Sequence, residues 1–246
     1  MKKTLWRVVN LILALAALGL GGAFIWLAIP AQLLPEANLA MQSTASVVVV
    51  KESGAYRFSP VGPTPDTALI FYPGGKVPPS AYAPAAVAIA EQGYTVFIVP
   101  MPINEAFFGV NLAEAVQAAH PDIKRWAMGG HSLGGAMAAE YTARHPGAVQ
   151  GLLFWASYSA ADLSGQRLKV ISVFGALESG RSKFISENAK AKLPNDTTFI
   201  EIPGGNHEQF GYYTGQLNDP PSAVSRTEQQ AQAVAAAVQL LEAIRP

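Results

Sequence analysis

The chain contains no cysteine. Disulfide bonds, thiolate metal sites, a cysteine nucleophile and a lipid-modified N-terminal cysteine are therefore excluded. Charge is scarce as well, because only 14% of the 246 residues are charged and the 17 basic side chains balance the 17 acidic ones. Without a basic excess or a run of like charge, we expect no nucleic-acid partner. The 50% share of hydrophobic residues excludes an intrinsically disordered chain.

Charge is absent from a long apolar segment near the N-terminus. Lys2, Lys3 and Arg7 precede this segment, and the next charged residue is Glu36. Residues 11–29 carry no polar side chain. Their number is close to the roughly 20 residues that a helix needs to cross a bilayer. The segment therefore predicts a membrane-anchoring helix within residues 1–30.

An uncleaved single-pass anchor and a cleaved signal peptide are the two interpretations of this segment. A signal peptide has a shorter apolar region and ends at small residues, whereas residues 37–41 form a poor cleavage site. We therefore favour the anchor. The basic residues before the helix place the N-terminus in the cytoplasm and the rest of the chain outside it. Residues 31–45 are predicted to be a linker, and residues 46–246 a single domain.

Beyond residue 45, apolar runs alternate with helical patterns. The expected strands cover residues 46–52, 55–60, 67–75, 94–100, 123–130, 149–157, 168–175 and 197–205. The expected helices cover residues 81–93, the second half of 106–120, 132–147, 181–194 and 226–246. The first two strands flank Ser53 and Gly54 and predict a hairpin. The alternation of continuously apolar strands with helices predicts an α/β domain whose mostly parallel central sheet is flanked by helices.

A glycine-rich pentapeptide follows the expected strand 123–130. Gly130-His131-Ser132-Leu133-Gly134 fits the pattern G-x-S-x-G, which requires a strand before it and a helix after it. In that pattern the serine occupies a sharp, strained turn, and its oxygen lies at a helix N-terminus where free N–H groups favour developing negative charge. A phosphate loop would need Gly-Lys followed by Ser or Thr, which is absent. Ser132 is therefore the candidate nucleophile.

A serine nucleophile needs a histidine base and a carboxylate that orients it, in the chain order Ser, acid, His. His207, in PGGNHEQFG, is the histidine that follows both Ser132 and a late strand. Glu178 follows the strand 168–175 and is the favoured acid, with Asp162 after the preceding strand as the alternative. His131 belongs to the turn itself, and its side chain is expected to face away from the serine's pocket.

Backbone N–H groups are expected to form the oxyanion hole. One donor is Leu133, the residue after the nucleophile, and the other lies in the glycine turn FYPGGKV after an early strand. Gly75 is the favoured second donor and Lys76 the alternative. Phe210, Tyr212 and Tyr213, which follow the candidate base, are predicted to line a substrate pocket or to belong to the core.

With these motifs in order, the chain resembles the α/β-hydrolase superfamily. More narrowly it is similar to the membrane-associated bacterial "alpha/beta hydrolase fold-5" group, which is related to dienelactone-hydrolase-like proteins. The resemblance rests on FYPGGKV, GGHSLGGAMA, VFGALES and EIPGGNHEQFGYY and covers roughly residues 47–244. It implies that Ser132, Glu178 and His207 are nucleophile, acid and base. Glu178 departs from the family pattern, in which this acid is usually aspartate.

The resemblance implies a serine hydrolase that cleaves an ester or related acyl bond through an acyl-enzyme, without a metal or other cofactor. The expected substrate is a small molecule, since the sequence has no insertion of the size of a lipase lid. Acyl transfer or peptide cleavage by the same three residues is one alternative. A non-catalytic binding or scaffold protein on the same fold is another. The sequence does not indicate an oligomeric state.

Overall fold

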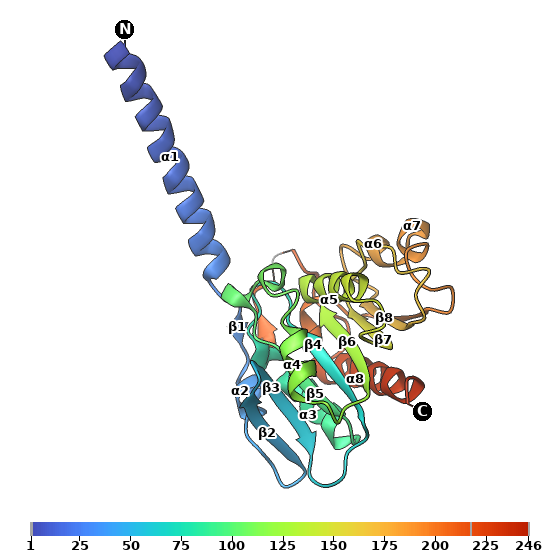
Figure 1. The fold of residues 1–246 in the computed structure, drawn as a ribbon. Helices are drawn as coiled ribbons and strands as arrows, with labels where there is room; N and C mark the ends of the chain where they lie inside the picture. The colour runs from blue at the N-terminus through green and yellow to red at the C-terminus, as the bar shows by residue number, and fades with distance from the viewer. Residues whose placement is uncertain (1, 217, 246) are drawn as a thin grey trace.

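The computed structural model describes residues 2–216 and 218–245, and an eight-stranded sheet forms the centre of its body (Figure 1). The strands of this sheet are β2 (Val47–Glu52), β3 (Ala55–Pro60), β4 (Thr67–Tyr72), β5 (Thr95–Ile98), β6 (Arg125–His131), β7 (Gly151–Trp155), β8 (Lys169–Gly175) and β9 (Thr198–Ile202). Their spatial order is β2-β3-β5-β4-β6-β7-β8-β9. The strands from β5 to β9 in this order are parallel, whereas β2 and β3 form the predicted antiparallel hairpin.

Helices cover both faces of the sheet, as the continuously apolar strands predict. The helices α3 (Ala83–Glu91) and α8 (Arg226–Ala243) pack on one face, and α4 (Ala113–Ala119) and α5 (Leu133–Arg144) pack on the other. Alternate residues of β4 enter the two cores, with Leu69 and Phe71 under α3 and α8 and Ile70 under α4 and α5. This alternation follows from the two-residue period of a strand.

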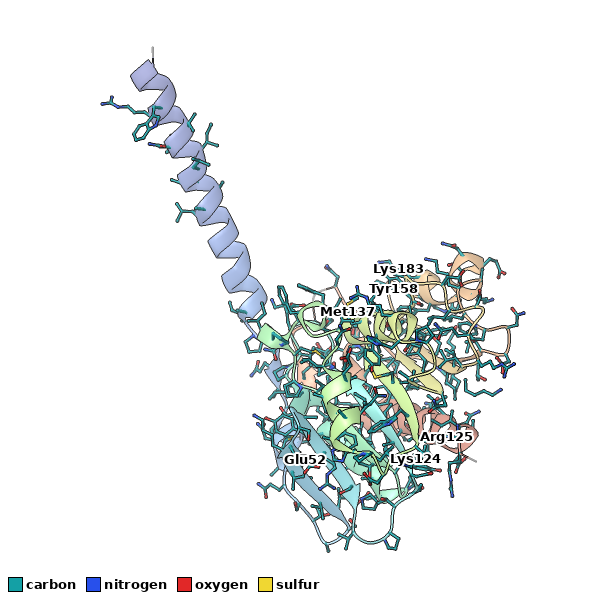
Figure 2. All side chains as sticks on the ribbon, viewed as in Figure 1. Glu52, Lys124, Arg125, Met137, Tyr158 and Lys183 are labelled. Atoms are coloured by element: carbon teal, nitrogen blue, oxygen red, sulfur yellow. The ribbon has the colours of Figure 1, made fainter. Side chains whose placement is uncertain are left out.

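The register of the parallel strands places their carboxyl ends at one edge of the sheet. Tyr72 pairs with Gly130, and Gly175 pairs with Ile202. Segments that follow β4, β6, β7, β8 and β9 therefore meet at that edge. In Figure 2, Tyr158 after β7 lies at this edge, and Arg125 at the start of β6 lies at the opposite one.

The predicted helix 181–194 is divided into two short helices, α6 (Ser182–Ile185) and α7 (Glu187–Lys190). Ser186 separates them in an extended conformation, with φ −61° and ψ 153°. Its side chain accepts a hydrogen bond from the backbone N–H of Ala189 at 3.3 Å and so caps the start of α7. A continuous helix would forgo this cap, which is why the prediction of one helix is wrong here.

The segment 31–45, predicted as a linker, is bound to the domain. It contains the strand β1 (Gln32–Leu33), which pairs antiparallel with β10 (Tyr213–Thr214), and the helix α2 (Pro35–Leu39). Ala31 donates its N–H to the carbonyl of Lys76 at 2.8 Å. The remaining short elements are the 3₁₀ turns η1 (Pro79–Tyr82), η2 (Pro102–Asn104), η3 (Ala106–Phe108) and η4 (Glu208–Phe210).

The N-terminal helix α1 (Lys2–Ala28) projects away from the body (Figure 1). Its apolar side chains include Leu11 and Leu18, which are 60% and 72% exposed. Within the described part of the chain, no helix combines the length and the mean hydropathy of a membrane span. The membrane anchor therefore stays a prediction from the sequence.

Candidate active site

Ser132 occupies the turn between β6 and α5, as the pentapeptide predicts. Its backbone angles are φ 51° and ψ −121°, a region that costs a non-glycine residue about 1–3 kcal/mol. Gly130 and Gly134 permit this turn because the strand and the helix approach closely. A Cβ on Gly130 would lie 2.4 Å from the carbonyl carbon of Gly134, and a Cβ on Gly134 would lie 2.3 Å from the carbonyl oxygen of Pro73.

Two hydrogen bonds from the end of β7 hold the strained residue. The N–H of Ser132 donates to the carbonyl of Trp155 at 2.9 Å. The hydroxyl of Ser157 donates to the carbonyl of Ser132 at 2.6 Å. These bonds fix the backbone on both sides of the Cα atom, so the side chain is held at the carboxyl edge of the sheet.

The structure brings His207 to Glu178. Nδ1 of His207 lies 3.0 Å from Oε2 of Glu178, whose side chain is only 1% exposed. The other carboxylate oxygen, Oε1, accepts the N–H of Gly175 at 2.6 Å. The side chain thus folds back over its own turn after β8, which accommodates the extra methylene of glutamate relative to aspartate. The pair fixes the ring through Nδ1, so Nε2 is free for a second partner.

Asp162, the alternative acid, lies apart from this pair. It is exposed, and its Oδ1 accepts hydrogen bonds from the N–H and the hydroxyl of Ser164 at 3.0 and 2.7 Å. These local bonds close the turn that follows β7 and keep its carboxylate in the surface loop. Of the two candidates, only Glu178 is in contact with His207.

Asp219 is a functional candidate that the sequence analysis missed. One carboxylate oxygen accepts the N–H of His207 at 3.1 Å, and the other accepts the N–H of Glu208 at 2.7 Å. Asp219 therefore caps the start of η4 and fixes the backbone of the candidate base. The only signal in the sequence is a loop aspartate before Pro220 and Pro221, which is too common a pattern to single it out.

Ser132 and His207 open into one cavity of about 380 Å³. Polar side chains form much of its wall. They are Ser157, Tyr158, Ser179, Lys183, Gln216, Asn218 and Asp219. Across the described ranges, this cavity included, no three His, Asp or Glu side chains gather in a way that suits a metal ion.

The turn after β4 supplies one free backbone donor. The N–H of Gly74 donates to the hydroxyl of Tyr82 at 3.0 Å, and the N–H of Lys76 donates to the carbonyl of Asn104 at 2.8 Å. Among the described residues, no acceptor bonds the N–H of Gly75 or that of Leu133 at the start of α5. Because the N–H of Lys76 is already bonded, Gly75 is the better candidate of the two, and the N–H groups of Gly75 and Leu133 stay available as donors among the described residues.

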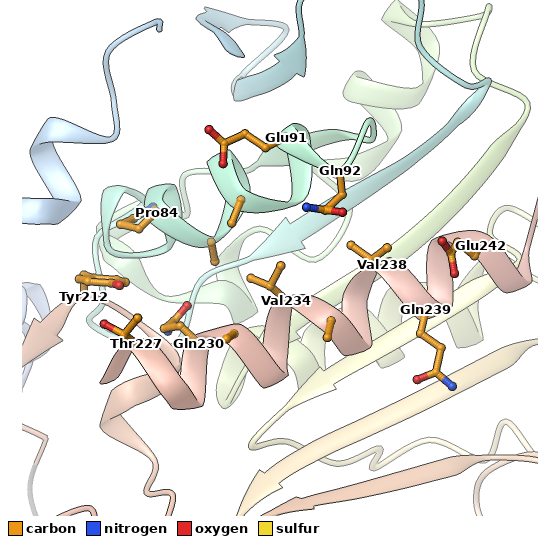
Figure 3. Close-up of a pocket in the computed structure, with 14 residues that line it drawn as sticks. Pro84, Glu91, Gln92, Tyr212, Thr227, Gln230, Val234, Val238, Gln239 and Glu242 are labelled. Atoms are coloured by element: carbon orange, nitrogen blue, oxygen red, sulfur yellow. The ribbon is translucent and has the colours of Figure 1, made fainter. Parts of the chain in front are cut away.

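The three aromatic residues after His207, for which the sequence left pocket and core open, do not line the cavity of Ser132. Phe210 and Tyr213 are fully buried, and both pack against the ring of His131. Tyr212 lines a separate groove of about 560 Å³ between α3 and α8, where Val234 and Val238 form part of the floor (Figure 3). Phe210 ends η4 and Tyr213 begins β10, so different elements carry these side chains away from the cavity of Ser132.

Comparisons with known proteins identify the family of this chain. The Alpha/beta hydrolase family matches residues 68–231. No curated protein matches the sequence. Similar solved structures share the fold at low identity. They include a hormone-sensitive lipase from a metagenome library, with a TM-score of 0.61 and 14% identity over 85% of this chain and 90% of that chain. A bacterial heroin esterase (0.61, 16%, 83% and 88%) and a predicted CIB-like hydrolase from Thermoplasma acidophilum (0.58, 14%, 79% and 98%) are further examples. The chain belongs to the alpha/beta hydrolase family.

Proposed function

We propose that the protein is a serine hydrolase that cleaves ester or related acyl bonds, with Ser132 as nucleophile, His207 as base and Glu178 as the orienting acid. The observation that carries the proposal is that the His207–Glu178 pair and Ser132 share one cavity beside two free backbone donors. A strained serine at a helix N-terminus, a fixed imidazole and free N–H groups are the parts that acyl transfer needs.

The reaction divides into two steps of the same kind. Ser132 Oγ attacks the acyl carbonyl while Nε2 of His207 takes the hydroxyl proton, and Glu178 accepts the Nδ1–H and stabilises the imidazolium. The N–H groups of Gly75 and Leu133 hold the tetrahedral oxyanion. His207 then gives the proton to the leaving alkoxide, and the acyl-enzyme remains. Water, deprotonated by His207, then attacks the acyl carbonyl. The bond from the acyl carbon to Ser132 Oγ breaks, His207 returns the proton to Oγ, and the acid leaves.

The cavity favours a small acyl group with polar character. Its size is at the lower end of the range for small-molecule sites, about 300–1,000 Å³. The hydroxyls, amides and ammonium group on its wall offer hydrogen bonds that a long alkyl chain cannot use. We therefore expect short-chain esters to be better substrates than long-chain ones.

Hydrolysis of p-nitrophenyl acetate and butyrate by the purified full chain tests the proposal. The wild type should release p-nitrophenol, and Ser132→Ala should reduce kcat to background, because no nucleophile remains. Ser164→Ala, a serine on the exposed loop of Asp162, is the matched control and should keep full activity. Equal rates for wild type and Ser132→Ala would contradict the proposal.

The N-terminal helix supports a proposal on location, namely that α1 anchors the protein with the hydrolase domain outside the cytoplasm. Its support is the apolar run 11–29, the basic residues before it and the exposed leucines of α1. Alkaline carbonate extraction of membranes from expressing cells tests this. We expect the full chain in the pellet, and a variant with Leu11, Leu15 and Leu18 changed to glutamine in the supernatant. Release of the wild type would contradict anchoring.

A further inference from the structure

His131, the residue before the nucleophile, is a buried group that the proposed reaction does not use. It is 1% exposed and does not line the cavity of Ser132. Its ring lies between the turn after β4 and the loop of His207. A Cβ on Gly74 would lie only 2.8 Å from Nδ1, so the absence of a side chain at Gly74 lets the turn approach the ring.

A chain of hydrogen bonds favours one position for the proton of His131. The N–H of Gly74 donates to the hydroxyl oxygen of Tyr82, and that oxygen lies 2.8 Å from Nδ1 of His131. Because the hydroxyl accepts from Gly74, its own proton is available for Nδ1. With Nδ1 as the acceptor, a neutral ring carries its proton on Nε2, which is buried and has no hydrogen-bond partner among the described residues. Burial and the neighbouring His207 lower the pKa of His131 well below its usual range, which keeps the ring neutral.

The same ring supports the candidate base. The rings of His131 and His207 lie 4.5 Å apart, centre to centre, at 47°. Phe210 stacks on His131 at 5.8 Å and 26°, and Phe210 follows His207 in the same loop. His131 therefore contacts the loop of the base through packing and the turn of the oxyanion donor through Tyr82.

We infer that Tyr82 and His131 form a positioning bridge, in which one hydroxyl and one neutral imidazole fix the oxyanion turn and the ring of His207 relative to Ser132. The inference rests on the proposed function and adds two positioning residues to it. The bridge acts on the transition state, because it fixes the Gly75 donor and the base without contacting the substrate. Its loss should therefore lower kcat and leave KM nearly unchanged.

Histidine ¹⁵N NMR of the wild type tests the proton assignment without any assay of activity. The chain has only four histidines, so each can be assigned by substitution. At pH 7, His131 should show a protonated Nε2 and an unprotonated Nδ1. A proton on Nδ1, or an imidazolium, would overturn the bridge. If this tautomer is found but the esterase assay shows no activity, the result contradicts the proposed function and supports the hydrogen bonds assigned to Tyr82 and His131.

Kinetics of Tyr82→Phe test the positioning role. We expect kcat for p-nitrophenyl acetate to fall about 10- to 100-fold, with KM changed less than about threefold, since small displacements of reacting groups have effects of this size. The control is Tyr72→Phe. Its buried hydroxyl also accepts one backbone N–H, from Ala113, and donates to one carbonyl, that of Val110. The Tyr72→Phe variant should lose about as much free energy of unfolding as Tyr82→Phe and keep the kcat of the wild type. Equal kcat values for the two variants would overturn the proposal.

Two substitutions at His131 provide a second measurement if Tyr82→Phe does not fold. Asparagine can place an oxygen near the position of Nδ1 and so keep an acceptor for Tyr82, whereas alanine cannot. His131→Asn should therefore recover part of the kcat that His131→Ala loses, although it lacks the ring beside His207. Identical kcat values for the two variants would show that the bond to Tyr82 has no positioning role.

Discussion

At the scale of single residues, the sequence leaves two carboxylates, Glu178 and Asp162, as partners for His207. Glu178 and Asp162 both follow a strand, so position in the sequence could only rank them. The structure separates them by local hydrogen bonds, because the N–H of Gly175 holds Glu178 inward and Ser164 holds Asp162 in its surface loop. Such bonds depend on the path of a loop, which no spacing in the sequence reveals.

Glu178→Gln should reduce kcat by a factor on the order of 10³ to 10⁴, since the amide can hold the imidazole in the wrong tautomer and cannot stabilise the imidazolium. Steady-state hydrolysis of p-nitrophenyl acetate measures this loss. Asp162→Asn is the matched control and should stay within about twofold of wild type. A larger loss in Asp162→Asn than in Glu178→Gln would exchange the two assignments.

We expect the buried Glu105 to make a pH-dependent contribution to the free energy of unfolding. It is 3% exposed, and a Cβ on Gly75 would lie 3.1 Å from its Oε2. Burial raises its pKa above the ordinary 4.5, and Lys76 opposes the shift. The folded state thus holds this proton more tightly than the unfolded state, so the contribution of Glu105 falls as pH rises from about 4.5 through the folded pKa.

Urea unfolding of wild type and Glu105→Gln between pH 4 and pH 8 checks this sign. The stability of the variant relative to wild type should increase with pH across that window and then level off. Glu187→Gln, whose side chain is 93% exposed, should show no such increase. A pH-independent difference for Glu105→Gln would contradict the account.

Individual elements differ in how far the sequence determines them. The strands from β4 to β8 were predictable because each contains a run of apolar residues. The strand β9 was predictable although Glu201 interrupts its apolar residues, and the β2–β3 hairpin was predictable because Ser53-Gly54 separates two strand-like segments. The pairing of β1 with β10 was not predictable, because each strand has only two residues and so shows no periodicity. The division between α6 and α7 was missed because a single capping serine overrides a helical pattern.

The contact between the ends of β8 and β9 predicts that Gly175→Ala is destabilising. A Cβ at this position would lie 2.4 Å from the carbonyl carbon and oxygen of Gly205, so the loop that carries His207 would have to move. Overpacking of this kind costs about 1–3 kcal/mol. Urea unfolding should show this loss, and kcat should fall as well because Glu178 and His207 separate. Gly165→Ala, with open space around its Cβ, should change stability by less than about 0.5 kcal/mol.

At the scale of the whole molecule, the parallel register assembles the candidate site. Gly75, Ser132, Glu178 and His207 follow four different strands, and the common edge of the sheet brings them together. This arrangement was predictable from alternating strands and helices, because parallel strands end on the same side. The wall of the cavity was not predictable from the sequence, because loops between residues 157 and 219 form most of it.

The central claim is that Ser132 is a nucleophile activated by His207 and Glu178. Its most direct test is mass spectrometry of the folded full chain after reaction with a fluorophosphonate, which forms a covalent bond only with an activated serine. We predict one adduct per chain, on the peptide that contains Ser132, and a much slower reaction in His207→Ala and Glu178→Gln. A folded chain without an adduct, or an adduct on another serine, would contradict the account.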